Sequence, residues 1–357
     1  MKRLFYTLLC MGGIILSLMP CSTNAQEKNT IEKSAFWGNS EAYLNKQAFR
    51  MFDLIDLALT ENPPTIGSSM VRKLALYNLD VMLHETKYDN SEPFYSFLFS
   101  RINKVITDLS EPVNEGIKIY KVYNDGFIAR TGSVTIAFDI VRGICNGKTL
   151  IPDSLVRQIV DYCDVLFITH NHNDHADPVV AEMFIKAGKP VVGPTNLWED
   201  NKNILHLRSE KVINKQLKLG KNQKTHQVRI FPGNQDELMN NIYVVTTEEK
   251  KTIVHIGDQY NKEDMTWITN IKKEIPQPDV LVVNCWTYEM NGLVEGFNPK
   301  LVITGHENEM GHTIDHREAF WLSFQKMEQI NKDYLVMGWG EWFHVPAVAG
   351  RSPSSPD

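Results

Sequence analysis

Residues 169–177 read THNHNDHAD and place three histidines and two aspartates within nine positions. Neutral imidazole nitrogens and carboxylate oxygens are ligands for zinc and also for manganese or iron, so ligand type alone does not select the metal. The alternative is a polar, turn-forming loop, but such loops seldom show the order H-x-H-x-D-H. We therefore expect a metal site with His170, His172, Asp174 and His175 as ligands.

The residues around this motif place it between a strand and a helix. The short apolar run at 164–168 (DVLFI) predicts a buried strand, and residues 178–187 have helical spacing. Side chains alternate in an extended segment, so His170 and His172 can project to the same side. Asp174 and His175 then lie at the turn towards the helix, and one loop can serve two metal ions.

Three other acidic or histidine residues, one before this motif and two after it, also lie at the ends of strand-like apolar runs. Asp139 ends the run SVTIAFD at 133–139, and Gly257-Asp258 follows TIVHI at 252–256. His306 ends the run LVITGH at 301–306. Residues at strand ends gather at one edge of a sheet, where loops carry functional groups.

Taken together, these motifs resemble the signature of the metallo-β-lactamase superfamily over residues 116–346. The resemblance implies a four-layer αβ/βα sandwich, with the metal loops at one edge. It also implies that Asp139 orders the site without binding metal. Asp258 would bridge two ions and His306 would be a ligand of the second. The nearest branch is similar to ascorbate-6-phosphate lactonase and N-acylphosphatidylethanolamine phospholipase D.

One motif departs from the family pattern. Family members carry a metal-binding histidine after a strand in this interval, whereas here the strand at 227–231 leads into PGNQD and the slot falls on Asn234. An amide oxygen is a weak zinc ligand. His206 and His226 are the alternatives in this interval. We expect one or two ions, with the position at His170 and His172 the weaker.

Residues 307–318 add further histidines and carboxylates after His306. His312 either supplies the missing donor or serves as a proton shuttle, because an imidazole gains and loses a proton near pH 7. Residues 315–318 are expected to open a helix at 318–330 and cap it, in which case His316 and Arg317 are structural. His255 is expected in the core, and His84 and His344 are expected to be structural.

The composition favours a globular enzyme. The chain has 357 residues with 43% hydrophobic content, enough for a sizeable core. A net charge of −6 and a pI near 6.0 provide no basic surface for nucleic acid. Cys145, Cys163 and Cys285 do not make a disulfide framework, and Cys163 and Cys285 are expected to be buried.

The first residues predict export. A basic start, an apolar stretch from Leu4 to Met19 and small residues before Gln26 are typical of a signal peptide at 1–25. Periplasmic location follows, with no membrane span in the mature chain; the alternative is a lipoprotein processed at Cys21.

These patterns divide the chain into four segments. Residues 1–25 are the leader, 26–115 a helical region, 116–346 the metallo-β-lactamase-like domain and 347–357 a disordered tail. Helices are expected at 40–60, 69–85 and 93–109, where they could cap the site or form a contact between copies.

The expected function is metal-dependent hydrolysis of a lactone, ester, amide or phosphodiester, on a small-molecule or lipid-like substrate. Zinc is the expected cofactor, with manganese or iron as alternatives. Asp174, Asp258 and His312 are the expected catalytic residues. The alternative is a non-catalytic metal- or ligand-binding envelope protein of the same fold, suggested by Asn234.

Overall fold

The computed structural model describes residues 38–347 of the chain. The chain divides into two units, residues 1–44 and 45–357, and both large sheets belong to the second. The expected leader and nearly all of the expected tail lie outside the described residues. Within residues 38–347, no helix combines the length and the apolar character needed to cross a membrane.

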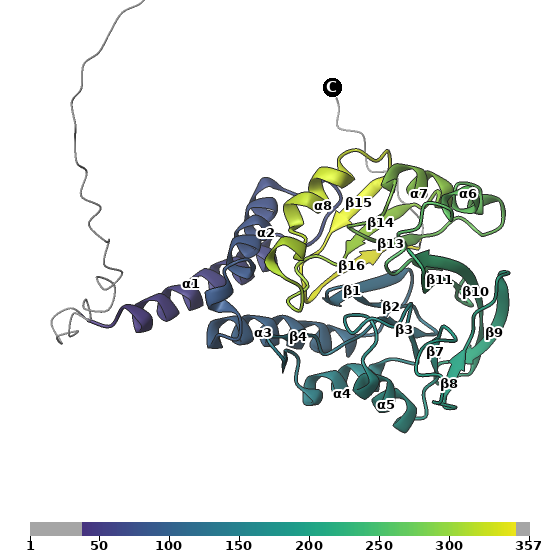
Figure 1. Cartoon of the computed structure of the whole chain (residues 1–357), viewed down its shortest axis with the longest axis horizontal. Coiled ribbons are helices and arrows are strands. Elements are labelled where there is room, and N and C mark those ends of the chain that lie inside the picture. The colour runs from purple at the N-terminus through teal and green to yellow at the C-terminus, as the bar shows by residue number, and fades with distance from the viewer. Residues whose placement is uncertain (1–37, 348–357) are drawn as a thin grey trace, which may run out of the picture. The chain divides into compact units, whose positions relative to one another are not determined.

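Two seven-stranded sheets form the centre of the second unit (Figure 1). The first has the order β16-β1-β2-β3-β6-β7-β8. Its strands are β1 (Ile117–Tyr123), β2 (Gly126–Arg130), β3 (Thr135–Phe138), β6 (Val165–Phe167), β7 (Val191–Gly193), β8 (Ile204–His206) and β16 (Glu341–Val345). The pairs from β16 to β3 are antiparallel, and those from β3 to β8 are parallel.

The second sheet has the order β15-β14-β13-β12-β11-β10-β9. Its strands are β9 (Ile213–Leu219), β10 (Lys224–Gln235), β11 (Leu238–Thr246), β12 (Thr252–His255), β13 (Val280–Asn284), β14 (Leu301–Gly305) and β15 (Asp333–Val336). Strands β12 to β15 are parallel and β9 to β12 antiparallel. A small hairpin, β4 (Ile144–Cys145) and β5 (Lys148–Thr149), stands apart.

Alternating side chains let each sheet face two cores. On β1, Ile117 and Ile119 join an apolar cluster that both sheets supply, whereas Tyr120 and Val122 join a second cluster shared with the helices. The sheets therefore pack face to face with helices outside, which confirms the expected αβ/βα sandwich. The helices are α1 (Ser40–Glu61), α2 (Met70–Leu83), α3 (Glu92–Leu109), α4 (Asp153–Tyr162), α5 (Pro178–Lys186), α6 (Met265–Ile268), α7 (Met290–Phe297) and α8 (Phe320–Met327), with short 3₁₀ turns η2 (Thr86–Tyr88), η3 (Ile271–Lys273) and η4 (Ile314–His316).

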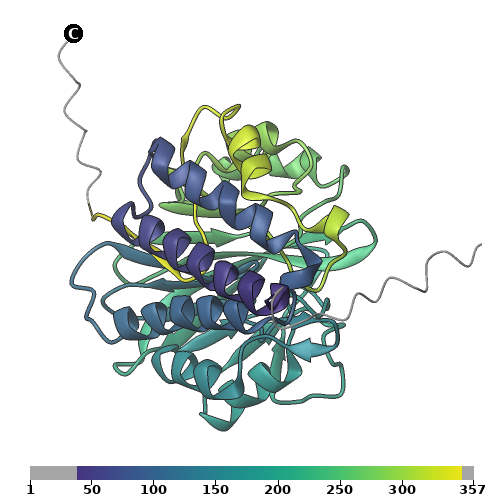
Figure 2. The same cartoon turned by 90° about the vertical axis from the view of Figure 1, so that its left-hand side faces the viewer.

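The helices expected at 40–60, 69–85 and 93–109 are confirmed, and α2 and α3 each begin at a serine cap. Ser69 accepts a hydrogen bond from the backbone of Arg72 at the start of α2. Figure 2 shows these helices, in purple and blue, facing the viewer. The carboxylate of Glu341 on β16 is buried between Arg72 and Arg101, which come from α2 and α3. Helices α2 and α3 are thus bonded directly to the first sheet.

Candidate metal centre

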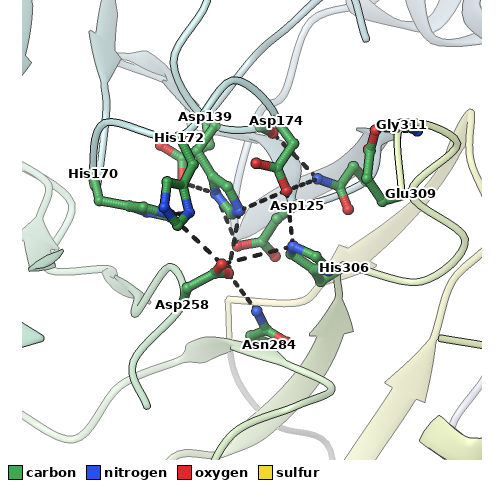
Figure 3. Close-up of polar contacts among 12 residues, drawn as sticks. Asp125, Asp139, His170, His172, Asp174, Asp258, Asn284, His306, Glu309 and Gly311 are labelled. Atoms are coloured by element: carbon green, nitrogen blue, oxygen red, sulfur yellow. Dashed lines mark hydrogen bonds and ion pairs between the residues drawn. The ribbon is translucent and has the colours of Figure 1, made fainter. Parts of the chain in front are cut away.

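Loops that follow three strands bring all six expected ligands together. Figure 3 labels His170, His172, Asp174, Asp258 and His306 among them. The loop after β6 carries His170, His172, Asp174 and His175, and the other ligands, Asp258 and His306, follow β12 and β14. They form two clusters: His170, His172 and Asp258, and Asp174, His175 and His306, with the donor atoms of each cluster within 4.8 Å of one another. We call these the first and the second cluster.

Asp258 belongs to the first cluster and also lies close to the second. Its Oδ2 is 3.6 Å from Nε2 of His170 in the first cluster and 3.7 Å from Nε2 of His306 in the second. Its Oδ1 is 3.2 Å from Nε2 of His175. This carboxylate is therefore placed to serve both clusters, as the resemblance implied.

The spacing of donor atoms within each cluster suits a metal ion. In the first cluster, Nε2 of His170 is 3.1 Å from Nδ1 of His172. In the second, Oδ2 of Asp174 is 3.0 Å from Nε2 of His306 and 3.5 Å from Nε2 of His175. Two donors that each lie about 2.1 Å from a tetrahedral zinc ion are roughly 3.4 Å apart. Both clusters match this separation.

The electrostatics also favour bound positive charge. Burial opposes ionisation of Asp258, yet His175 and His306 hold its pKa well below the usual range. Burial likewise opposes protonation of His306, but Asp258 and Asp174 raise its pKa to about 9. Burial lowers the pKa of His170 to about 3, so this imidazole is neutral and its lone pair is available. Buried carboxylates beside a neutral imidazole fit a metal ion, whose ligands must be deprotonated.

Asp139 orders the second cluster from behind. Its Oδ2 accepts a hydrogen bond from Nδ1 of His175 at 2.9 Å and its Oδ1 accepts one from the backbone of Thr169 at 2.8 Å. With its proton on Nδ1, His175 turns Nε2 towards Asp174 and Asp258, where that nitrogen is buried without a hydrogen-bond partner among the described residues. This agrees with the expected role of Asp139.

Close backbone packing fixes Asp258. Gly257 has φ +53°, and a Cβ there would lie 2.5 Å from both Oδ1 of Asn240 and Oγ1 of Thr169. Asn240 Oδ1 accepts a hydrogen bond from the backbone of Asp258 at 3.1 Å, and the amide of Asn284, at the end of β13, donates to Oδ1 of Asp258. A larger residue at 257 would move the shared carboxylate.

The slot that the sequence assigned to Asn234 is filled by its neighbour, Gln235. Asn234 Oδ1 accepts from Nη2 of Arg208 at 2.8 Å, and its Nδ2 donates to Asp264 at 3.1 Å, so its side chain is engaged away from both clusters. Gln235, on the opposite face of β10, donates from Nε2 to Oδ2 of Asp258 at 3.1 Å. The assignment was wrong by one position, and in a strand one position reverses the face.

Neither of the other histidines in that interval joins a cluster. His206 ends β8, and its Nε2 lies 2.7 Å from the backbone oxygen of Leu197. His226 is buried near the start of β10, and its ring nitrogens have no partner among the described residues. His255 is buried and stacks on Phe138 with ring centroids 5.1 Å apart, which confirms its core position.

His312 lies beside the second cluster. Its Nε2 is 3.6 Å from Oδ2 of Asp174, and its Nδ1 is 3.2 Å from the backbone oxygen of His316. Among the described carboxylates, Asp174 is the only one within ion-pair distance of His312. His312 was expected to be either the missing donor of the first cluster or a proton shuttle. Its position beside the second cluster disfavours the role of donor. Burial lowers the pKa of this imidazole.

The expected helix at 318–330 is shorter, and its start was wrongly interpreted. The helix α8 begins at Phe320, and Asp80 of α2 accepts from the backbone of Phe320 at 2.8 Å and of Trp321 at 3.2 Å. The cap thus comes from another helix and not from residues 315–318. His316 instead stacks on Trp286, with ring centroids 5.4 Å apart.

Arg317 is structural, as expected, but through different partners. Its guanidinium binds both carboxylate oxygens of Asp89 at 3.0 Å. It also donates to the backbone oxygen of Leu83 at 3.0 Å, and Nε2 of His84 lies 2.6 Å from the backbone oxygen of Arg317. The helical region therefore supports this loop from behind. His344 on β16 lies 2.9 Å from the backbone oxygen of Glu115, a structural contact.

Sequence reasoning missed a buried acid behind His175. Asp125, in the turn between β1 and β2, is fully buried, 3.9 Å from Nδ1 of His175 and 3.7 Å from Nε2 of His255. Burial raises its pKa to about 6. Its carboxylate packs against Gly305, where a Cβ would collide with Oδ1 of Asp125. The one signal in the sequence was an acid in a turn between two apolar strands.

A cavity of about 490 Å³ opens onto both clusters. Its lining includes His172, Asp174, Asp258 and His306 from the clusters. The remaining wall carries charged and aromatic groups, among them Trp286, His312, His316, Glu318 and Lys326. The candidate metal-binding residues therefore face a cavity that a small molecule can enter.

Comparison with known proteins finds no family and only weak structural similarity. No protein-family model matches this chain, and curated proteins gave no match. Among solved structures, the metallo-hydrolase Igni18 of Ignicoccus hospitalis KIN4/I is 18% identical over 64% of this chain and 97% of its own, with a TM-score of 0.48. Isothiocyanate hydrolase from Delia radicum gut bacteria is 12% identical over 64% of this chain and 100% of its own, with a TM-score of 0.46. CmlA, a diiron β-hydroxylase from Streptomyces venezuelae, is 15% identical over 66% of this chain and 55% of its own, with a TM-score of 0.45. Similarities of this size assign no activity, which must be argued from the site.

Proposed function

We propose that this protein is a metal-dependent hydrolase of the metallo-β-lactamase superfamily. The observation that carries the proposal is the pair of donor clusters that share Asp258 at the wall of an open cavity. Structural metal sites are closed by protein ligands, whereas catalytic sites keep a position open to substrate. The exposure of His172 and the partial exposure of Asp174 support the second kind.

The residues present fit zinc, with manganese or iron as alternatives. The second cluster and Asp258 would hold one ion with two imidazoles and two carboxylates, and the first cluster would hold a second. When bound, such an ion lowers the pKa of a water ligand to about 7 and polarises the bond under attack.

The protein's own groups would position the reactants and move the protons. Asp258 is held by Asn240 and Asn284, so its two oxygens are fixed between the clusters. Asp174 would act as ligand or proton acceptor. His312 lines the cavity beside Asp174, where Nε2 is placed to pass a proton between water and the leaving group.

The proposed substrates are lactones, esters, amides or phosphodiesters, carried by a small or lipid-like molecule. The similarity of the motifs to those of ascorbate-6-phosphate lactonase and N-acylphosphatidylethanolamine phospholipase D supports a lactone or a phosphodiester first. The cavity of about 490 Å³ has the size of a small-molecule site.

The test is a panel of lactone, ester, amide and phosphodiester substrates with protein stripped of metal and then reloaded with zinc, manganese or iron. We expect turnover of at least one class that disappears with the metal and returns on reloading. Metal-independent turnover, or none with any loaded ion, would contradict the proposal.

A second candidate is a non-catalytic binding protein of the same fold. It is favoured by one observation, the glutamine in the slot where the family places a histidine. A protein of this kind would bind metal or ligand in the same panel without turnover.

We also propose that the chain is exported to the periplasm, on the strength of the leader-like residues 1–25. Mass spectrometry of the protein from its native envelope should find Gln26 first. A lipid-modified Cys21 would place the protein on a membrane instead.

A further inference from the structure

Gln235 donates a hydrogen bond to the shared carboxylate. Its Nε2 lies 3.1 Å from Oδ2 of Asp258, the oxygen that is 3.6 Å from Nε2 of His170 and 3.7 Å from Nε2 of His306. The other amide atom, Oε1, is buried and has no hydrogen-bond partner among the described residues. The amide of Gln235 therefore acts on Oδ2 of Asp258 as a neutral hydrogen-bond donor.

The backbone holds Gln235 in this place. It ends β10, where it pairs with Leu238 of β11 on one side and forms a bridge with Tyr260 on the other. The flanking hydrogen bonds, from Tyr260 to the oxygen of Asn234 at 3.0 Å and from Asp236 to the oxygen of Tyr260 at 3.1 Å, fix the register. This pairing fixes the face of β10 on which the side chain lies.

The two clusters consequently differ in charge. The first cluster has two imidazoles, Asp258 as its one carboxylate and the neutral amide of Gln235 beside it. The second cluster has two imidazoles and the carboxylate of Asp174, and Asp258 also lies within 3.2 Å of His175 and 3.7 Å of His306. A divalent cation is attracted more strongly by two carboxylates than by one, and an amide oxygen is a poor ligand for zinc. An ion in the first cluster would also have to displace the hydrogen bond from Gln235 to Asp258.

We propose that Gln235 makes this a one-metal centre: it puts a neutral amide where the first cluster would need a third strong donor, so that a single ion is held tightly by Asp174, His175, His306 and Asp258. This inference rests on the proposed metal-dependent function and specifies how many ions that function uses. It gives Gln235 a positioning role, because the amide sets the orientation of a ligand.

The test counts metal ions in the full-length mature protein after dialysis against zinc and then against dilute chelator. The parent should retain one equivalent per chain. Gln235→His should retain two, because an imidazole adds the strong third donor. Gln235→Glu should also retain two, because a carboxylate facing Asp258 favours an ion between them.

The matched control is Asn234→His, which adds an imidazole one position earlier on the opposite face of β10. It should retain one equivalent, like the parent. With manganese in place of zinc, the electron paramagnetic resonance spectrum should show spin coupling between two ions in Gln235→His and an uncoupled ion in the parent. Both readouts are independent of turnover.

Two tightly held equivalents in the parent would overturn the inference while leaving the hydrolase proposal intact. Folded Gln235→His and Gln235→Glu proteins that both retain one equivalent would overturn it as well, as would two equivalents in Asn234→His. No retained metal in the parent would remove both this inference and the proposed function.

Discussion

The two loops that carry the histidines are held by different parts of the chain. The first loop, residues 169–177, is bound by Asp139, which directly follows β3, and by Asn124 and Asn241 of the two sheets. Hydrogen bonds from the backbone of His175 and Ala176 to the oxygen of His172 close it. The second loop, residues 306–318, is tied to Asp80 and Asp89, 228 positions earlier. The first loop is therefore held by residues of the sandwich, and the second is held in addition by Asp80 of α2 and by Asp89.

Asp258 is the point at which the two loops meet, so its replacement should have the largest effect on turnover. Asp258→Asn keeps the shape but removes the charge shared by both clusters, and we expect a loss greater than about 100-fold, the upper end for residues that only support ligands. The measurement is kcat/KM with metal content. The matched control is Asp279→Asn, at the opposite end of β13, where Asp279 accepts from the backbone of Thr252. Equal activity of Asp258→Asn and the parent would rule out the proposed mechanism.

Replacement of Asp139, which binds the first loop, should have the next largest effect. Asp139→Asn replaces an acceptor by a donor opposite Nδ1 of His175, which favours the wrong tautomer of a ligand. We expect about 10- to 100-fold weaker metal binding, the usual range for a residue behind a ligand. Competition with a fluorescent chelator measures it, and unchanged affinity would show that the first loop holds its shape without Asp139.

Replacement of Asp89, which binds the second loop, should affect stability more than turnover. Asp89→Asn breaks a bidentate pair with Arg317 in which the two side chains are 4% and 5% exposed. Losing one partner of such a buried pair costs about 3–5 kcal/mol of unfolding free energy, and we expect turnover to fall less than about tenfold because no ligand is displaced. Urea unfolding and kcat measure the two effects. Glu248→Gln, which breaks an exposed pair with Lys224, is the control and should cost under about 1 kcal/mol. A deep loss of turnover without destabilisation would mean that Asp89 acts on the chemistry.

The smallest expected effect concerns the pH dependence at Asp80. Burial raises its pKa to about 6 from 3.8, although three N–H groups donate to it. A raised folded-state pKa contributes stability that is full below about pH 4 and lost as the pH rises through about 6. Asp80→Asn does not titrate, so the stability of the parent relative to this variant should fall between about pH 4 and about pH 7. A flat or rising difference in urea unfolding would contradict this.

The contrast between the loops explains what could be predicted from the sequence. Side-chain order placed His170, His172, Asp174 and His175 because a strand, a turn and a helix follow one another within a few residues. The helices at 40–60, 69–85 and 93–109 and the strands β3, β6, β10, β12 and β14 were also predicted, since their apolar patterns are local.

The remainder depended on contacts that no local pattern contains. The cap of α8 comes from Asp80, so residues 315–318 looked like a helix start when they are not one. Gln235 was missed because its face on β10 follows from the pairing register and not from the residues themselves. Asp125 and Asn284 were missed because each is an ordinary turn or strand-end residue until the sheets bring it to the site.

The position of β16 bears on the order in which the chain can fold. This strand lies at residues 341–345 yet forms the edge of the first sheet by pairing with β1, and Glu341 closes an ion pair with Arg72 across 269 positions. Contacts so distant in sequence form slowly, because a long loop must close first. Until they form, the edge of β1 stays open and can pair with another chain. Refolding should therefore be slow and prone to aggregation until residue 341 has docked.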